Sequence, residues 1–285
     1  MTSFLLAATL LFAPADADIA YDTASELVKK HTPRDSGTLS SRRAADFIHD
    51  RLKASGAKAE LDFFKADTPA GERYFVNVES AFVSNTNNEW IVFVSHFDTK
   101  RGVSCPGAND GASTTGLLIA LAGKLVKQNP EKTNVLLLWT DGEECFNDYA
   151  ENDGLWGSRH AAKKLKDSGV KVRAVVCFDM LGDKDLKITI PENSHQGFRD
   201  GILKIAKRKN LGDKIVAVDD IVIDDHVPFL EAGFKAVDLI DFNYGSRPGL
   251  NDYWHTSKDT IDKISRESLL LAGEIATWLI NGLDR

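Results

Sequence analysis

Hydrophobic residues recur along this chain with two spacings that alternate. Apolar side chains three and four positions apart, with charged residues between them, predict helices. Such stretches cover residues 39–55, 112–127, 155–166, 195–209, 227–232 and 264–280. Runs that alternate in polarity, or that are almost wholly apolar, predict strands. These runs cover residues 59–64, 74–83, 90–95, 134–139, 172–178 and 236–240.

The order of these segments predicts an α/β fold with helices on both faces of one sheet. Residues 135–139 (VLLLW) and 172–178 (VRAVVCF) are mostly apolar. Central parallel strands have this composition because both of their faces are covered. No internal repeat, and no linker rich in Pro, Gly or Ser, divides the chain. We therefore expect residues 18–285 to form a single domain.

The first seventeen residues predict a signal peptide. The apolar run from Phe4 to Phe12 is too short to cross a membrane, and Ala15-Asp16-Ala17 offers the small residues of a cleavage site. No Lys or Arg precedes the run, although signal peptides usually carry one there. We expect a leader over residues 1–17 and an exported protein, periplasmic or extracellular. The alternative is a cytosolic protein with an apolar N-terminus.

Composition narrows the class of protein further. The net charge of −7 argues against a nucleic-acid binder, which would usually show a basic stripe. No later segment is apolar for long enough to span a bilayer. The three cysteines, Cys105, Cys145 and Cys177, lack C-x-x-C spacing, which argues against a cysteine zinc site. We expect buried thiols, or alternatively a Cys105–Cys145 disulfide, in a chain that is a monomer.

Polar side chains directly follow three of the predicted strands. The motif HFD (96–98) follows the first, DGEE (141–144) the second and Asp179 the third. In parallel sheets, ligands bind beyond the carboxyl ends of the strands, so these side chains should meet at one edge. His96 and Asp98 share a face of the extended chain. Such a pair suits a metal ligand with a supporting carboxylate.

The adjacent acids Glu143 and Glu144 are the strongest single indication of a metal site in the sequence. Neighbouring like charges are unfavourable at a strand end unless a cation neutralises one, which leaves the other free to act as a base. Asp110 precedes a predicted helix and suits either a helix cap or a metal ligand. Catalytic zinc takes three protein ligands and keeps one position open. Asp110, Glu144 and His255 fit that set, with Glu143 as the proton-transferring residue.

The motifs also resemble a known family over roughly residues 40–280. In order they are HFD, PGANDGAS, DGEE, FDMLG, DDHVPFLEAG and WHTSKDT. This order resembles the zinc exopeptidase superfamily, which includes bacterial leucyl aminopeptidases and animal-type glutaminyl cyclases. The resemblance implies a three-layer sandwich around a twisted, mixed and mostly parallel sheet. It also disfavours a non-catalytic receptor-like relative, because such relatives have lost metal ligands that this chain retains.

The aminopeptidase branch of that superfamily implies two zinc ions. Asp110 would bridge them, Glu144 and His255 would hold one, and His96 and Asp179 would hold the other. Glu143 would accept a proton from the water that attacks the peptide bond.

The cyclase branch implies one zinc ion, held by Asp110, Glu144 and His255. The segment CFNDYAENDGLW (145–156) matches in length an insertion that cyclases carry, and DDHVPFLEAG (224–233) is close to a cyclase motif. We therefore expect a glutaminyl-peptide cyclotransferase that acts on peptide or protein N-termini and releases ammonia. A two-zinc aminopeptidase is the alternative.

Further roles follow from the cyclase resemblance. Asp179 and Asp224 would stabilise the substrate amine and the leaving group, and Trp254 and Tyr149 would form walls of the pocket. Tyr149 stands where many cyclases carry a Trp. The stretch before Trp254 is longer than in animal cyclases, and we expect it to shape the rim of the pocket.

Overall fold

A computed structural model describes residues 9–84 and 89–283 of the chain. Within these residues, eight strands form one sheet in the order β1-β2-β4-β3-β5-β8-β6-β7. They are β1 (Glu60–Thr68), β2 (Gly71–Phe82), β3 (Glu89–His96), β4 (Asn134–Thr140), β5 (Lys171–Asp179), β6 (Ile188–Ile190), β7 (Ile215–Ala217) and β8 (Ala236–Ile240). The helices are α1 (Pro14–His31), α2 (Leu39–Ala54), η1 (Ala108–Ser113), α3 (Thr114–Lys127), α4 (Trp156–Ser168), α5 (Gln196–Arg208), α6 (His226–Glu231), η2 (Ile261–Lys263) and α7 (Arg266–Leu283).

The centre of the sheet is parallel and its flanks are antiparallel. Strands β4, β3, β5 and β8 run in one direction. The β1–β2 hairpin joins β4 in antiparallel fashion, and β6 pairs antiparallel with β8. Every residue of β4 is buried, which explains its unbroken apolar run. The predicted mixed, mostly parallel sheet is confirmed.

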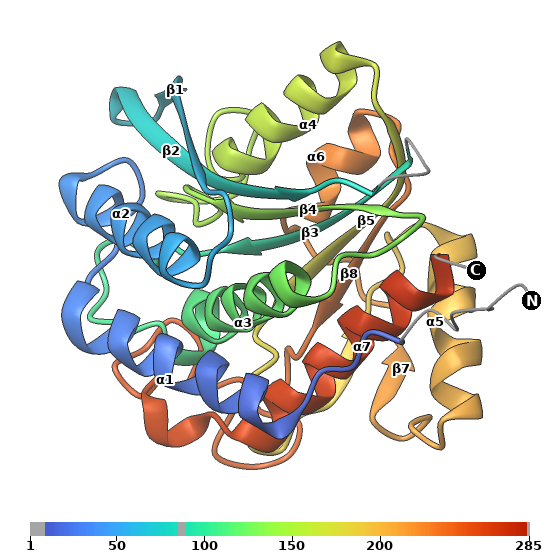
Figure 1. The fold of residues 1–285 in the computed structure, drawn as a ribbon. Coiled ribbons are helices and arrows are strands. Elements are labelled where there is room, and N and C mark those ends of the chain that lie inside the picture. Colours follow the sequence, from blue (N-terminus) through green and yellow to red (C-terminus); the bar gives the residue numbers. More distant parts are fainter. Residues whose placement is uncertain (1–8, 85–88, 284–285) are drawn as a thin grey trace, which may run out of the picture.

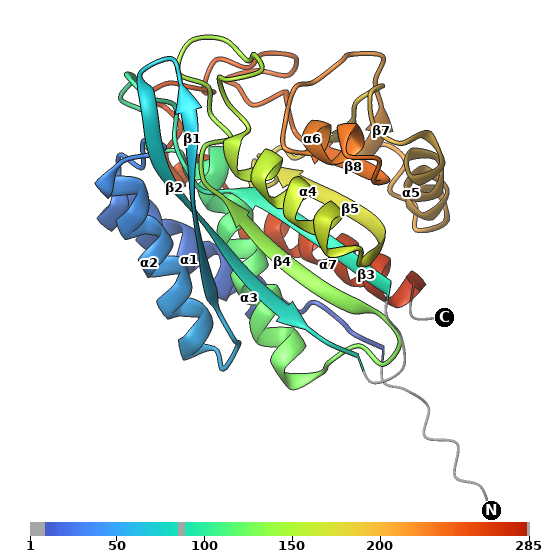
Figure 2. The same ribbon diagram turned by 90° about the horizontal axis from the view of Figure 1, so that it is seen from above.

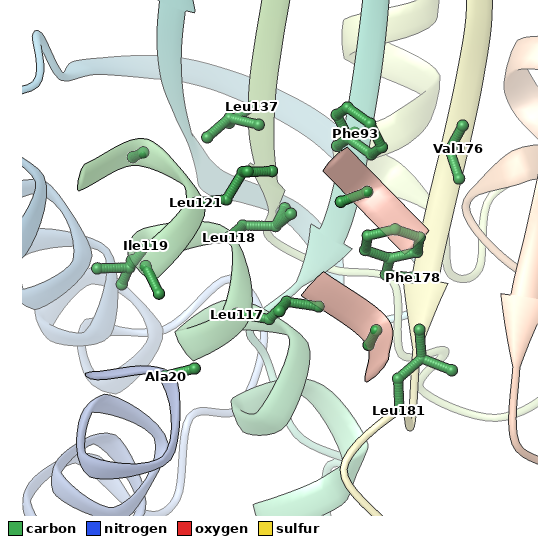
Figure 3. Packing of buried hydrophobic residues seen from close by; sticks show 14 of the residues in the cluster. Ala20, Phe93, Leu117, Leu118, Ile119, Leu121, Leu137, Val176, Phe178 and Leu181 are labelled. Carbon is green, nitrogen blue, oxygen red and sulfur yellow. The ribbon is translucent and has the colours of Figure 1, made fainter. Parts of the chain in front are cut away.

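Helices cover both faces of the sheet, as predicted. Figures 1 and 2 show α1, α2, α3 and α7 on one face and α4 and α6 on the other. Helix α3 packs closest to the central strands. Its side chain Leu121 lies beside Leu137 of β4, and Leu117 extends toward Phe178 of β5 (Figure 3).

Helix α1 was not predicted. Most of its buried side chains are small (Ala17, Ala20, Thr23 and Ala24), and its backbone lies so close to α3 that a Cβ on Gly116 would lie 2.2 Å from the carbonyl oxygen of Ala20. The predicted leader boundary after residue 17 falls inside this helix, and Leu10 and Phe12 are buried in the main core. The start of the predicted apolar run lies outside the described residues. The leader itself stays a prediction.

Other differences concern short segments. The predicted helix over 112–127 begins at Thr114, because η1 before it contains non-helical backbone at Asp110 and Gly111. Strands β6 and β7 were not predicted because each has only three residues. The three cysteines are buried free thiols, so the alternative Cys105–Cys145 disulfide is absent. Among the described residues, no helix has the length and apolar character needed to cross a membrane.

Candidate metal and catalytic site

The carboxyl edge of the parallel strands gathers the residues that the sequence singled out. His96 is the last residue of β3 and Asp179 the last of β5, while Glu143 and Glu144 follow the end of β4. Asp110 reaches the same edge from η1. The convergence expected from the strand ends is therefore present in the structure.

Asp110, Glu144 and His255 form one compact group of potential metal ligands. Nε2 of His255 lies 2.9 Å from Oε1 of Glu144 and 3.4 Å from Oδ2 of Asp110. Asp110 and Glu144 are buried, and His255 is partly exposed. One donor atom from each of the three residues lies within 4.8 Å of the others. The predicted ligand set for a single zinc is thus brought together.

His96, Asp110 and Asp179 form a second such group that shares Asp110. Nε2 of His96 lies 3.2 Å from Oδ1 of Asp110 and 3.1 Å from Oδ1 of Asp179. All three side chains are buried. The two oxygens of Asp110 therefore face one histidine each, as a bridging carboxylate would require.

The residues present fit a divalent metal. Oδ2 of Asp110 and Oε2 of Glu144 are buried without a hydrogen-bond partner, a costly state for a carboxylate oxygen. Burial and the nearby charge of Asp110 raise the pKa of Glu144 to about 7. A bound cation would remove both penalties, and imidazole with carboxylate oxygens is a donor set that zinc accepts.

Asp98 fixes the turn that carries the two glutamates. Its Oδ1 accepts a hydrogen bond from the backbone N–H of Glu143 (3.2 Å), and its Oδ2 accepts one from the N–H of Glu144 (3.1 Å). It also lies 3.7 Å from Nδ1 of His96. The sequence predicted only the contact with His96. One buried carboxylate thus orients residues from two strand ends.

Asp259 fixes the loop that carries Asp110 from one side. Its carboxylate accepts hydrogen bonds from the backbone N–H groups of Asn109 (2.8 Å) and Asp110 (3.2 Å). The hydroxyl of Tyr244 donates to the same carboxylate at 2.6 Å. Asp259 therefore orients the loop that carries Asp110.

Arg34 fixes the same loop from the other side. Its fully buried guanidinium donates to the carbonyl oxygens of Phe97 (2.7 Å), Pro106 (3.0 Å) and Gly107 (2.9 Å). These carbonyls flank His96 on one segment and precede Asp110 on the other. Sequence reasoning missed Arg34 because a lone Arg in a loop carries no signal of burial.

The segment after Glu144 places a hydroxyl on the predicted base. The hydroxyl of Tyr149 donates to Oε1 of Glu143 at 2.8 Å. Asp153 organises this segment by accepting the backbone N–H of Asn147 at 2.9 Å. Gly154 has a φ of +85°, and a Cβ there would lie 2.7 Å from the Tyr149 ring, so only glycine fits.

Glu143 and Asp224 sit in surroundings that favour their protonated forms. Burial, together with the charge of Glu144, raises the pKa of Glu143 well above its usual value. Burial and the charges of Asp179 and Asp225 do the same for the pKa of Asp224. A carboxyl group with a raised pKa can carry a proton, as general acid–base chemistry requires.

A cavity of about 260 Å³ opens above these groups. Trp254 forms part of its wall and stacks on the His255 ring, with ring centroids 3.8 Å apart. The residues that line the cavity are Asp110, Glu143, Glu144, Tyr149, Asp179, Ile221, Val222, Ile223, Asp224, Ile240, Phe242, Trp254 and His255. Each predicted site residue except His96 therefore faces one space, and His96 lies behind Asp110 and Asp179.

An α/β sandwich with paired carboxylate–histidine groups at the carboxyl edge of its sheet defines a class of metal-dependent enzymes. The family model of Peptidase family M28 matches residues 77–279. The chain belongs to that family.

Its curated relatives include glutaminyl-peptide cyclotransferases. The protein of that name from Drosophila melanogaster is 27% identical over 84% of this chain and 75% of its own length. The glutaminyl-peptide cyclotransferase-like protein of Bos taurus is 28% identical over 82% of this chain and 67% of its own length.

Solved structures show how widely the fold is shared. The glutaminyl cyclase of an Acidobacteriales bacterium superposes with a TM-score of 0.89 and 32% identity, covering 100% of this chain and 99% of that one. A leucine aminopeptidase precursor from Bacteroides thetaiotaomicron superposes with a TM-score of 0.82 at 22% identity, covering 96% and 99%. The fold alone therefore does not separate the two activities.

Proposed function

We propose that this protein is a zinc-dependent glutaminyl-peptide cyclotransferase that converts N-terminal glutaminyl peptides to pyroglutamyl peptides. The observation that carries the proposal is the contact between Tyr149 and Glu143. Through this contact, the segment 145–156, which resembles the cyclase insertion, touches the residue that would transfer protons. The similarity to the Acidobacteriales glutaminyl cyclase over the whole chain supports the same activity.

The substrate would enter the cavity with its N-terminal residue. Asp110, Glu144 and His255 would hold one zinc ion, which when bound supplies Lewis acidity toward the side-chain amide carbonyl. Trp254, Asp179 and Asp224 line the cavity. The carboxyl groups of Asp179 and Asp224 would bind the amine and the leaving nitrogen. Holding the substrate folded back on itself lowers the barrier, since the attack is intramolecular.

Glu143 would move the proton. The α-amine of the substrate attacks its own side-chain amide carbon, forming a new C–N bond while the old one breaks. Glu143 accepts a proton from the amine and returns it to the departing nitrogen, which leaves as ammonia. The hydroxyl of Tyr149 keeps Oε1 of Glu143 in place during both transfers.

A two-zinc aminopeptidase is the second candidate, and one observation favours it. The group His96, Asp110 and Asp179 has donor atoms close enough to hold another ion. In that case water would be the nucleophile, Glu143 would accept its proton, and peptides with varied first residues would be cleaved.

Two substrates on the purified protein distinguish these activities. A Gln-initiated peptide is assayed for ammonia release, and a leucyl anilide is assayed for cleavage. We expect ammonia without anilide cleavage, and about one zinc per chain by elemental analysis. Anilide cleavage without ammonia release, with two zinc ions per chain, would replace the cyclase by the peptidase.

We also propose that the protein is exported, on the basis of the apolar run that begins at Phe4. N-terminal sequencing of the protein from its native cells tests this. Cleavage after Ala17 is the expected result, and an N-terminus that still carries the apolar run would overturn the proposal. Such cleavage would also remove Leu10 and Phe12, which are buried in the core.

A further inference from the structure

A second cavity, of about 530 Å³, lies beside the turn that carries Glu143. Asp141 lines this cavity, whereas Glu143 and Glu144 line the cavity already described. Its other walls come from the start of α2 and from the β1–β2 hairpin, which lie side by side (Figures 1 and 2). We call it the hairpin cavity, and its lining residues are Gly37, Thr38, Leu39, Arg42, Phe63, Glu72, Arg73, Tyr74, Phe75, Val76 and Asp141. Its volume falls within the roughly 300–1,000 Å³ of pockets that hold small molecules.

The walls of the hairpin cavity present large apolar side chains to solvent. Leu39 is 77% exposed, Tyr74 67% and Phe63 55%. Exposed apolar side chains that gather at one place mark an interaction site, whereas scattered ones do not. Beneath them lies the buried ring of Phe75, which stacks on Trp156 with ring centroids 5.1 Å apart. The apolar part of a ligand would therefore meet walls from two elements and a fixed aromatic floor.

Arg73 adds a positive charge to these apolar walls. Its Nε is buried without a hydrogen-bond partner among the described residues, so an acceptor on a ligand would satisfy it. The other cation of the lining is already engaged, because the guanidinium of Arg42 pairs with Asp46 at 2.9 Å and lies 4.2 Å from the centre of the Phe63 ring. The start of α2 also lines the cavity, and a helix N-terminus carries partial positive charge.

The two acids of the lining do not oppose a negatively charged ligand. Glu72 pairs with Lys65 of β1 at 2.7 Å. Asp141 is buried, and its carboxyl group accepts the hydroxyl of Ser41 at 2.6 Å and the N–H of Val76 at 3.1 Å. Burial raises the pKa of Asp141 to about 8, so this group is mostly neutral at neutral pH. The charge that a ligand meets in the cavity is therefore that of the arginines.

We infer that the hairpin cavity binds an amphiphilic anion, a small molecule with one acidic group on an apolar body. The acidic group would accept hydrogen bonds from Arg73, and the apolar body would cover Leu39, Phe63 and Tyr74. The inference concerns a different cavity from that of the proposed cyclase reaction and does not depend on that activity.

The probe for this site is anilinonaphthalene sulfonate, which joins a sulfonate to apolar rings and fluoresces when the rings leave water. Titration of the purified protein should show saturable binding of about one probe per chain. The neutral phenylnaphthylamine has the same rings without the sulfonate, and we expect it to bind about tenfold more weakly, since it cannot accept a hydrogen bond from a charged group. Displacement of the probe by decanoate or by phenylbutyrate distinguishes an aliphatic from an aromatic ligand.

Variants of the lining separate the two halves of the site. Arg73→Gln should weaken the sulfonate probe about tenfold or more and leave the neutral probe unchanged. Arg73→Lys keeps the charge and should retain most of the affinity, which separates loss of charge from damage to the fold. Phe63→Ala should weaken both probes several-fold. The matched control is Arg247→Gln, because Arg247 is exposed and does not line the hairpin cavity.

Another cavity offers a direct way to overturn the inference. It is lined by Arg208, Lys209 and Trp278, among others, and could take the same probe. Loss of binding in Lys209→Gln with unchanged binding in Arg73→Gln would place the probe there instead. Equal affinity for the charged and the neutral probe, no displacement by either acid, or no saturable binding would also overturn the inference.

Discussion

The cavity above the potential metal ligands has a floor of acidic and histidine side chains near the strand ends and a rim of exposed apolar side chains, and the two are built in opposite ways. On the floor, each carboxylate that orients a potential ligand is buried and accepts several hydrogen bonds, as Asp98 and Asp259 do. On the rim, Ile221 and Phe242 present side chains to solvent. Two hydrogen bonds hold the backbone at Val222, and an edge-to-face contact with Trp254 holds the Phe242 ring. The groups proposed for the chemistry are thus constrained from many directions, whereas the exposed side chains of the rim have few contacts. Changes to the floor should therefore cost far more activity than changes to the rim.

The largest effect is expected for Glu143→Gln. Gln keeps the shape and can still accept the Tyr149 hydroxyl, but it cannot take up a proton. We expect kcat to fall about 100- to 10,000-fold with zinc content unchanged. Glu151→Gln, an exposed change in the neighbouring segment, is the control. Near-normal turnover in Glu143→Gln would mean that another group moves the proton.

The next largest effect is expected on zinc affinity. His255→Ala removes one of three ligands, so we expect zinc affinity to fall by more than about 100-fold, beyond the loss typical of supporting residues. Competition with a chromogenic chelator measures the affinity directly. His49→Ala, which alters a histidine on α2, should leave it unchanged. Unaltered zinc binding in His255→Ala would exclude His255 from the ligand set.

A smaller loss of zinc affinity is expected for Arg34→Lys. Lysine keeps the charge but cannot donate to three carbonyls in the geometry of the guanidinium fork. We expect zinc affinity to fall about 10- to 100-fold as the loop before Asp110 loosens. Arg266→Lys, on the exposed start of α7, is the matched control. If zinc affinity stays the same while only the melting temperature falls, the role of Arg34 is general stability rather than positioning.

Among changes to residues of the cavity floor, Tyr149→Phe is expected to have the smallest effect on kcat. Loss of a hydrogen bond to a charged group should lower kcat about tenfold. Because the hydroxyl stabilises the carboxylate form of Glu143, its removal raises the pKa of Glu143. The acid limb of the pH–rate profile should then move to higher pH. Tyr74→Phe, on the exposed β1–β2 hairpin, controls for loss of a hydroxyl, and an unmoved acid limb in Tyr149→Phe would argue against the contact.

The sequence predicted those parts of the fold and site that follow from local pattern. Unbroken apolar runs predicted the central strands, and the parallel direction of these strands predicted that Asp179 and Glu144 would reach the same edge of the sheet, where both line one cavity. Helix α1 was missed because its contacts with α3 depend on small residues, which carry little periodic signal. Arg34 and the exposed rim isoleucines were missed because burial and exposure in loops depend on distant segments. The residues next to a position in the sequence do not specify which distant segments pack against it.

Asp98 has a consequence for how such a protein can change over time. One carboxylate sets the backbone of both the residue that would hold the metal and the residue that would carry the proton. The two tasks therefore cannot be adjusted separately by substitutions at this turn. Engineering of a new reaction on this scaffold, or its natural divergence, should begin in loops that Asp98 does not touch, where a new substrate can be admitted without disturbing either glutamate.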